Sequence, residues 1–339
     1  MKPKKYILSV DGGGIRGIIP AILLEEIEKR TNKPIAKIFD LMVGTSTGGI
    51  IVAGLCRKDN KGKPLYSAND MVGIYEKHGL EIFKGRGIIN DIMSFILKAK
   101  YSEENIERVL GNYFGESTLV NVLTNLSLTS YDIHNCGPIL FKSWSDNIDF
   151  LKPKETKIVD SSTKLIKLKD ALRATTAAPT FFRSKKLTIN KVDRILVDGG
   201  VFANNPATVA YVSSQELYPN NSCDITILSI GTGVSEIPVK FTSKPPSSPL
   251  SWVKNAFILN VMFNSGNNFI NYQLKEILGP KYIRIEPQLK FASADLDNAT
   301  EKNIKNLKQD AALAIEKNGD VIEEFCKTVV NDERYSERG

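Results

Sequence analysis

The first fifty residues contain the same pattern twice: a short apolar run, a glycine-rich turn, and a longer apolar segment with helical spacing. Residues 6–10 form one strand candidate, and glycines recur over residues 12–17 before the first helical segment. Residues 38–43 form a second strand candidate, followed by the glycine turn at 44–48 and another apolar helix. Two successive strand, turn and helix units predict a mainly parallel sheet with helices on both faces.

Four more apolar runs are strand candidates, at residues 126–129, 139–141, 195–197 and 225–230. We therefore predict a three-layer α/β/α fold with a mainly parallel central sheet and a helical C-terminal cap. We expect one domain, made of a core over residues 1–235 and a helical extension over residues 236–330 that packs on it. Residues 331–339 are expected to form a frayed tail.

The charge balance favours anionic partners. Lys and Arg number 45 against 38 Asp and Glu, a net charge of +7, and membrane surfaces attract such proteins. The basic residues are dispersed, so we expect no nucleic-acid polymer as partner. The four cysteines lie far apart, which argues against a disulfide framework or a zinc site.

No apolar run is long enough to span a bilayer or to act as a classical secretion signal. We therefore expect a cytoplasmic protein with peripheral membrane contact, while non-classical secretion stays open.

The second glycine turn, Gly44-Thr45-Ser46-Thr47-Gly48, matches G-x-S-x-G between a strand and a helix. A serine at the tip of such a sharp turn exposes its hydroxyl when the flanking glycines let the backbones pass. The N-terminus of the following helix carries a partial positive charge that favours a developing oxyanion. Ser46 is therefore a candidate nucleophile.

Asp198 is the better candidate for the base that would activate Ser46. It ends the apolar strand at 195–197 and precedes two glycines, so we expect it at the same sheet edge as Ser46. A turn-stabilising aspartate is the alternative. The only histidines are His78 and His134, which we expect to be structural or surface residues, although a triad through His134 stays open.

The first glycine loop also fits G-x-G-x-x-G through Gly12, Gly14 and Gly17, in the context of a dinucleotide-binding fingerprint. That fingerprint expects an acidic residue at the end of the second strand, where this chain has Val43-Gly44-Thr45. A dinucleotide-binding oxidoreductase is therefore a remote alternative.

Three segments together resemble the patatin-like phospholipases: Asp11 to Gly17, Gly44 to Gly48, and Asp198-Gly-Gly-Val-Phe-Ala-Asn-Asn-Pro206. The resemblance implies a patatin-like catalytic core and a serine acyl hydrolase with a dyad of Ser46 and Asp198, without metal or organic cofactor. It also implies an oxyanion hole built by the glycine loop, with Gly12, Gly13 and Gly14 as backbone donors and Arg16 as a supporting charge.

The substrate class that follows from the resemblance is a phospholipid at a membrane surface, cleaved by a phospholipase A or lysophospholipase reaction through an acyl-enzyme. An alternative keeps this hydrolase but makes it an effector that a small anionic ligand, such as a cyclic nucleotide, or a protein partner activates. Residues 84–100 combine apolar side chains with flanking lysines, which suits an interfacial helix, a lid or an ordinary core helix.

Overall fold

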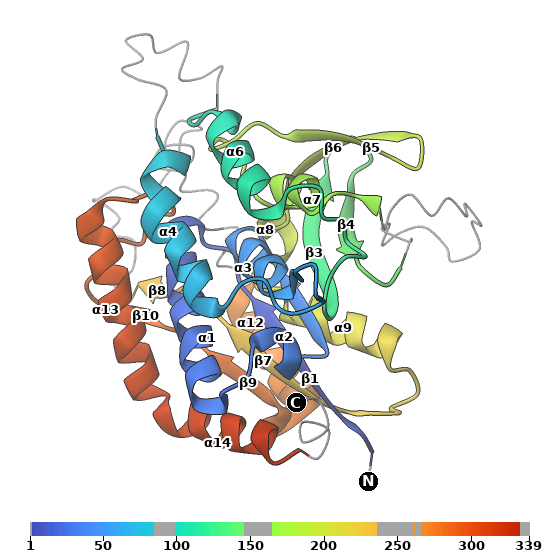
Figure 1. Cartoon of the computed structure of the whole chain (residues 1–339), viewed down its shortest axis with the longest axis vertical. Helices are drawn as coiled ribbons and strands as arrows, with labels where there is room; N and C mark the ends of the chain where they lie inside the picture. Colours follow the sequence, from blue (N-terminus) through green and yellow to red (C-terminus); the bar gives the residue numbers. More distant parts are fainter. Residues whose placement is uncertain are drawn as a thin grey trace.

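The computed structural model describes residues 2–84, 99–145, 165–235, 261, 263 and 266–332. Within these residues eight strands form one sheet, and helices cover both of its faces (Figure 1). The predicted three-layer α/β/α fold is therefore confirmed. The basic segment at 85–98 and the tail from residue 333 lie outside the described residues.

The central sheet is parallel over five neighbouring strands and antiparallel at one side. Its order is β5 (Lys185–Ile189), β6 (Val192–Asp198), β3 (Asn125–Asp132), β2 (Leu41–Gly44), β1 (Lys4–Val10), β7 (Asp224–Ile230) and β9 (Tyr282–Ile285). The five neighbouring strands β3, β2, β1, β7 and β9 run parallel. β4 (Gly137–Lys142) and β6 both pair antiparallel with β3, and β5 pairs antiparallel with β6.

β1 lies in the middle of the sheet because it is apolar on both faces. Tyr6, Leu8 and Val10 pack into the larger core cluster with α1 (Ile18–Thr31) and α3 (Thr47–Cys56). Ile7 points to the other face, into a cluster that includes α9 (Ala207–Leu217) and α12 (Asn267–Leu278). Successive side chains of a strand alternate between faces, so a strand covered on both sides has a continuous apolar run.

The second strand begins later than the sequence predicts. Residues 35–38 form a short helix, α2 (Ile35–Ile38), and β2 starts only at Leu41. The carboxylate of Asp40 accepts hydrogen bonds from the backbone N–H of Tyr6 at 3.0 Å and from Nζ of Lys5 at 2.7 Å. These bonds to β1 fix the point at which the chain enters the sheet.

The C-terminal part of the chain is not solely helical. α13 (Glu301–Lys317) and α14 (Gly319–Val330) pack against α1, as Figure 1 shows. The same part also supplies β9, an edge strand of the central sheet, and β10 (Gln288–Leu289), which pairs with β8 (Val234–Ser235). These residues therefore complete the sheet as well as covering it.

No helix among the described residues has the length and hydropathy required to cross a membrane. All four cysteines are unpaired, and Cys56 and Cys326 are buried.

Candidate active site

Ser46 lies at the tip of a sharp turn between β2 and α3. Its backbone has φ 53° and ψ −122°, in the positive-φ region that non-glycine residues rarely adopt. The flanking glycines make the turn possible: a Cβ on Gly48 would lie 2.2 Å from the carbonyl oxygen of Val10, and one on Gly44 2.5 Å from backbone atoms of Gly48. The close approach of strand and helix thus requires glycine at both positions.

A hydrogen bond to Thr175 stabilises the strained turn, and sequence reasoning did not identify this residue. The backbone N–H of Ser46 donates to Oγ1 of Thr175 at 2.9 Å. Thr175 is the last residue of α7 (Leu168–Thr175) and is fully buried. Nothing in its local sequence distinguishes it from an ordinary threonine at a helix end.

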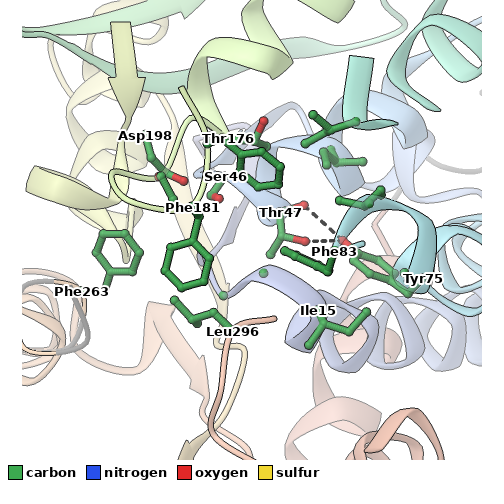
Figure 2. Close-up of a pocket in the computed structure, with 18 residues that line it drawn as sticks. Ile15, Ser46, Thr47, Tyr75, Phe83, Thr176, Phe181, Asp198, Phe263 and Leu296 are labelled. Atoms are coloured by element: carbon green, nitrogen blue, oxygen red, sulfur yellow. Dashed lines mark hydrogen bonds between the residues drawn. The ribbon is translucent and has the colours of Figure 1, made fainter. Parts of the chain in front are cut away.

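Asp198, the last residue of β6, lies beside Ser46, and Figure 2 shows both side chains together at the pocket. Oδ1 of Asp198 accepts from the N–H of Gly200 at 2.7 Å, while Oδ2 has no hydrogen-bond partner among the described residues. Burial raises the pKa of Asp198 to about 7. The nearby Ser46 hydroxyl and the Gly200 N–H lower this pKa, but by less than burial raises it. The carboxyl is therefore held close to the protonation midpoint at neutral pH.

We expected Asp198 at the same sheet edge as Ser46 because the carboxyl ends of parallel strands meet there. That reason is wrong. β6 runs antiparallel to β3. The last three residues of β6 pair with the last three residues of β3, and Asp198 lies opposite Ser130. β3 extends beyond β2, whose last residue Gly44 lies opposite Leu128. Because β6 runs back along this overhang, its C-terminal end still reaches the edge of the sheet where Ser46 lies.

The glycine loop faces the same pocket. Gly13 and Gly14 line it, and their N–H groups, like that of Thr47 at the start of α3, have no acceptor among the described residues. The N–H of Gly12 differs, because it donates to the carbonyl of Asn204 at 3.0 Å. Two of the three expected loop donors therefore have no acceptor among the described residues and belong to residues that line the pocket, whereas the N–H of Gly12 is already bonded.

Arg16 does not line the pocket. Its guanidinium is buried and donates to the carbonyl oxygens of Gly233 at 3.1 Å and Gly13 at 3.4 Å. Burial lowers its pKa to about 10, so it stays charged at neutral pH. In this structure Arg16 holds the backbone of the glycine loop.

A buried ion group lies under the start of the same loop. Arg284 on β9 donates to both carboxylate oxygens of Asp11, at 2.9 and 2.6 Å, and to Oγ of Ser229 at 2.7 Å. It also pairs with Glu286. These contacts tie the end of β1 to the far edge of the sheet.

The pocket next to Ser46 and Asp198 has an almost entirely apolar lining and a volume of about 640 Å³ including its open side. Its apolar lining residues are Ile15, Ile50, Ile82, Phe83, Ile106, Ala178, Phe181, Phe182, Phe263 and Leu296. Tyr75 and Thr47, which share a 2.6 Å hydrogen bond, supply polar atoms at one side (Figure 2). Apart from Ile15, which lies within the glycine loop, sequence reasoning identified none of these apolar residues as part of a site.

The two histidines lie on different elements of the fold. His78 is on α4 (Ala68–Ile82) and contacts Glu81, and His134 lies in the turn after β3. Neither lines the pocket. Among the described residues no cluster of histidine, cysteine or carboxylate side chains could hold a metal ion.

Comparison with known proteins gives a consistent set of relatives. The family model described as patatin-like phospholipase matches residues 8–211. Patatin-like protein 1 of Arabidopsis thaliana is 29% identical over 97% of this chain and 87% of its own length. Patatin-like protein 3 of the same plant is 30% identical over 89% of this chain and 78% of its own length.

Among solved structures, VipD from Legionella pneumophila aligns with a TM-score of 0.37 at 11% identity. The alignment covers 92% of this chain and 67% of VipD.

Proposed function

The chain belongs to the patatin-like phospholipase family, and from this premise we propose that it is a lipid acyl hydrolase of the phospholipase A or lysophospholipase type. It would cleave carboxylic esters of membrane phospholipids with Ser46 as nucleophile and Asp198 as base. One observation carries this proposal: a serine held at positive φ lies beside a buried carboxyl of raised pKa, and both open on an apolar pocket.

In the proposed reaction, the Ser46 hydroxyl attacks the ester carbonyl carbon while the Asp198 carboxylate accepts its proton. The carbonyl oxygen becomes an oxyanion, which the N–H groups of Gly13, Gly14 and Thr47 stabilise. The tetrahedral intermediate then expels the leaving alcohol, which takes the proton from Asp198. Each preorganised donor of this kind contributes roughly 10²- to 10³-fold in rate.

The second half repeats these steps with water. Water attacks the acyl-enzyme carbonyl as Asp198 accepts a proton from it, and collapse releases the fatty acid and returns the proton to Ser46. A base works best when its pKa lies near the operating pH. The burial that raises the pKa of Asp198 to about 7 therefore makes this carboxylate a stronger base than an exposed aspartate.

The character of the pocket supports a lipid substrate. An apolar cavity stabilises a hydrocarbon chain by removing it from water, at about 0.8 kcal/mol for each buried CH₂ group. The net charge of +7 favours approach to an anionic lipid surface. Long-chain acyl esters presented at such a surface fit both features.

The test uses vesicles of phosphatidylglycerol and phosphatidylcholine, with released fatty acid and lysophospholipid measured by mass spectrometry. We expect Ser46→Ala to lower the rate by roughly 10⁴-fold or more. Ser213→Ala is the matched control, because Ser213 is a buried serine on α9 whose hydroxyl has no partner among the described residues. It should keep the wild-type rate.

A fluorophosphonate probe provides a second measurement, since it should attach to the peptide that contains Ser46 in the wild type and not in Ser46→Ala. Hydrolysis that persists in Ser46→Ala would contradict the proposal.

A further inference from the structure

One wall of the pocket comes from a part of the chain beyond the residues that the family model matches. Leu296 lies on residues 290–299, between β10 and α13, which we call the wall loop. Its side chain is 7% exposed. Figure 2 shows it among the side chains that line the pocket, together with Phe181 and Ile15.

The wall loop is bonded directly to the glycine loop. The carbonyl of Leu296 accepts from the N–H of Ile15 at 2.8 Å. A Cβ on Gly14, which has φ +58°, would lie 2.0 Å from that same carbonyl oxygen. Leu296 therefore contacts the backbone that would stabilise the oxyanion and also lines the cavity beside it.

α13 holds the wall loop from one side. Asp310, fully buried, accepts the backbone N–H groups of Lys290, Phe291 and Ala292 at 3.0 to 3.3 Å. Asn303 accepts from the N–H of Ser293 at 2.8 Å and donates to the carbonyl of Asn298 at 2.8 Å. These bonds satisfy a buried carboxylate and leave the loop little freedom.

On the opposite side of the pocket, Tyr101 and Lys100 hold the wall loop through contacts with Asp297. Its carboxylate accepts from the hydroxyl of Tyr101 at 2.6 Å and pairs with Lys100. The N–H of Tyr101 in turn donates to the carbonyl of Phe181, a lining residue, at 2.9 Å. Burial and then the Asp297 carboxylate raise the pKa of Tyr101 above its usual range, so its hydroxyl remains a donor.

From these contacts we propose that the wall loop sets the length of acyl chain that the pocket accepts, with Leu296 as the specificity-determining residue. Asp297, Asn303 and Asp310 are positioning residues that hold Leu296 in place. The inference rests on the proposed acyl hydrolase activity. It also assigns α13 a role in substrate selection, because this helix carries two of the positioning residues, Asn303 and Asp310.

The experiment measures kcat/KM for p-nitrophenyl esters of four, eight, twelve and sixteen carbons, which vary only the acyl part. Leu296→Ala deepens the pocket, so the ratio of the sixteen-carbon to the four-carbon ester should rise by about tenfold or more. Leu296→Trp fills the pocket, and the same ratio should fall by a similar factor. A single methylene in an apolar pocket changes kcat/KM by roughly 10- to 200-fold.

The control is Leu23→Ala, which shortens a fully buried leucine of α1 that does not line the pocket. It should leave the ratio at the wild-type value. A ratio of two rate constants does not depend on the fraction of folded enzyme, so a lower folding yield of any variant does not affect it. An unchanged ratio in both Leu296 variants would overturn the inference.

Tyr101→Phe tests whether the bond at Asp297 acts through Leu296. Because it frees Leu296 to move aside, the variant should lower KM for the long ester while kcat stays within about threefold, a split that general destabilisation would not produce. Combined with Leu296→Ala, it should shift the chain-length ratio no further than Leu296→Ala alone, because coupled sites are non-additive. Additive shifts would show that Tyr101 does not position Leu296.

The outcome also separates this inference from the proposed function. If Ser46→Ala abolishes hydrolysis of the four-carbon ester and the Leu296 variants leave the ratio unchanged, only the role of the wall loop is refuted. If Ser46→Ala still hydrolyses that ester, the dyad itself is refuted.

Discussion

Replacing Asp198 by asparagine should make the fold more stable while it abolishes hydrolysis. The side chain is fully buried, one of its oxygens has no partner among the described residues, and burial raises its pKa from 3.8 to about 7. The charged form that the reaction needs is therefore the form that the fold disfavours. Asparagine has the same shape, can still accept from the N–H of Gly200, and carries no charge.

The magnitude follows from proton linkage. Between pH 3.8 and about pH 7 the folded protein holds the Asp198 proton while the unfolded chain has lost it. The folded state then binds more protons, so the free energy of unfolding falls as the pH rises through this window. Each pKa unit corresponds to about 1.4 kcal/mol, which gives a penalty of about 2 kcal/mol at pH 5 and about 4 kcal/mol at pH 8.

The assay is urea unfolding of the wild type and Asp198→Asn at pH 5 and pH 8. We expect the variant to be more stable at both values, with its advantage larger by roughly 2 kcal/mol at pH 8. Glu324→Gln changes an exposed carboxylate on α14 and serves as the control for the change in charge. An advantage that is constant or shrinks toward pH 8 would refute the linkage argument.

Three further predictions concern the same site. The kcat/KM of the wild type should rise with pH through an apparent pKa near 7, because the base must be ionised to accept a proton; a profile that is flat from pH 5 to 9 would argue against Asp198. Thr175→Val removes the acceptor of the Ser46 N–H and should lower kcat by roughly 10- to 100-fold, at about 1 to 3 kcal/mol for a buried unpaired donor; Thr175→Ser should restore most of the rate. His134→Ala should keep most of the activity, since His134 does not line the pocket, and a loss as deep as that of Asp198→Asn would favour a histidine base.

The glycine turns could be predicted because close backbone contacts allow only glycine at these positions. Gly44 and Gly48 stand where β2 and α3 pass each other and the carbonyl of Val10 approaches, so only glycine fits. An apolar run with glycines at such positions is typical of a strand that passes directly into a helix. For this reason the turn that carries Ser46 could be located from sequence.

The direction of β6 could have been predicted from the length of the turn before it. Only Asn190 and Lys191 separate β5 from β6, and both have positive φ, as a tight hairpin turn requires. A two-residue connection excludes a parallel pair. Asp198 was placed correctly, but by an argument that holds only for parallel strands.

The pocket lining had no comparable signal. Phe181, Phe263 and Leu296 are apolar residues on three separate segments, and an apolar side chain has the same sequence pattern in a core as in a cavity. Their role depends on long-range packing, such as the bonds from α13 to the wall loop, that no local pattern encodes.

Because Asp198 is carried on the overhang of β3, the alignment of the dyad depends on strand register. A slip of two residues between β3 and β6 would keep every side chain on its face yet move Asp198 by about 7 Å along the sheet. Asp132 opposes such a slip: its carboxylate accepts from the N–H of Ile195 at 3.3 Å and from Arg194 at 3.2 Å. Asp132, which takes no part in the proposed reaction, thus helps to keep the Asp198 carboxylate in its position beside the Ser46 hydroxyl.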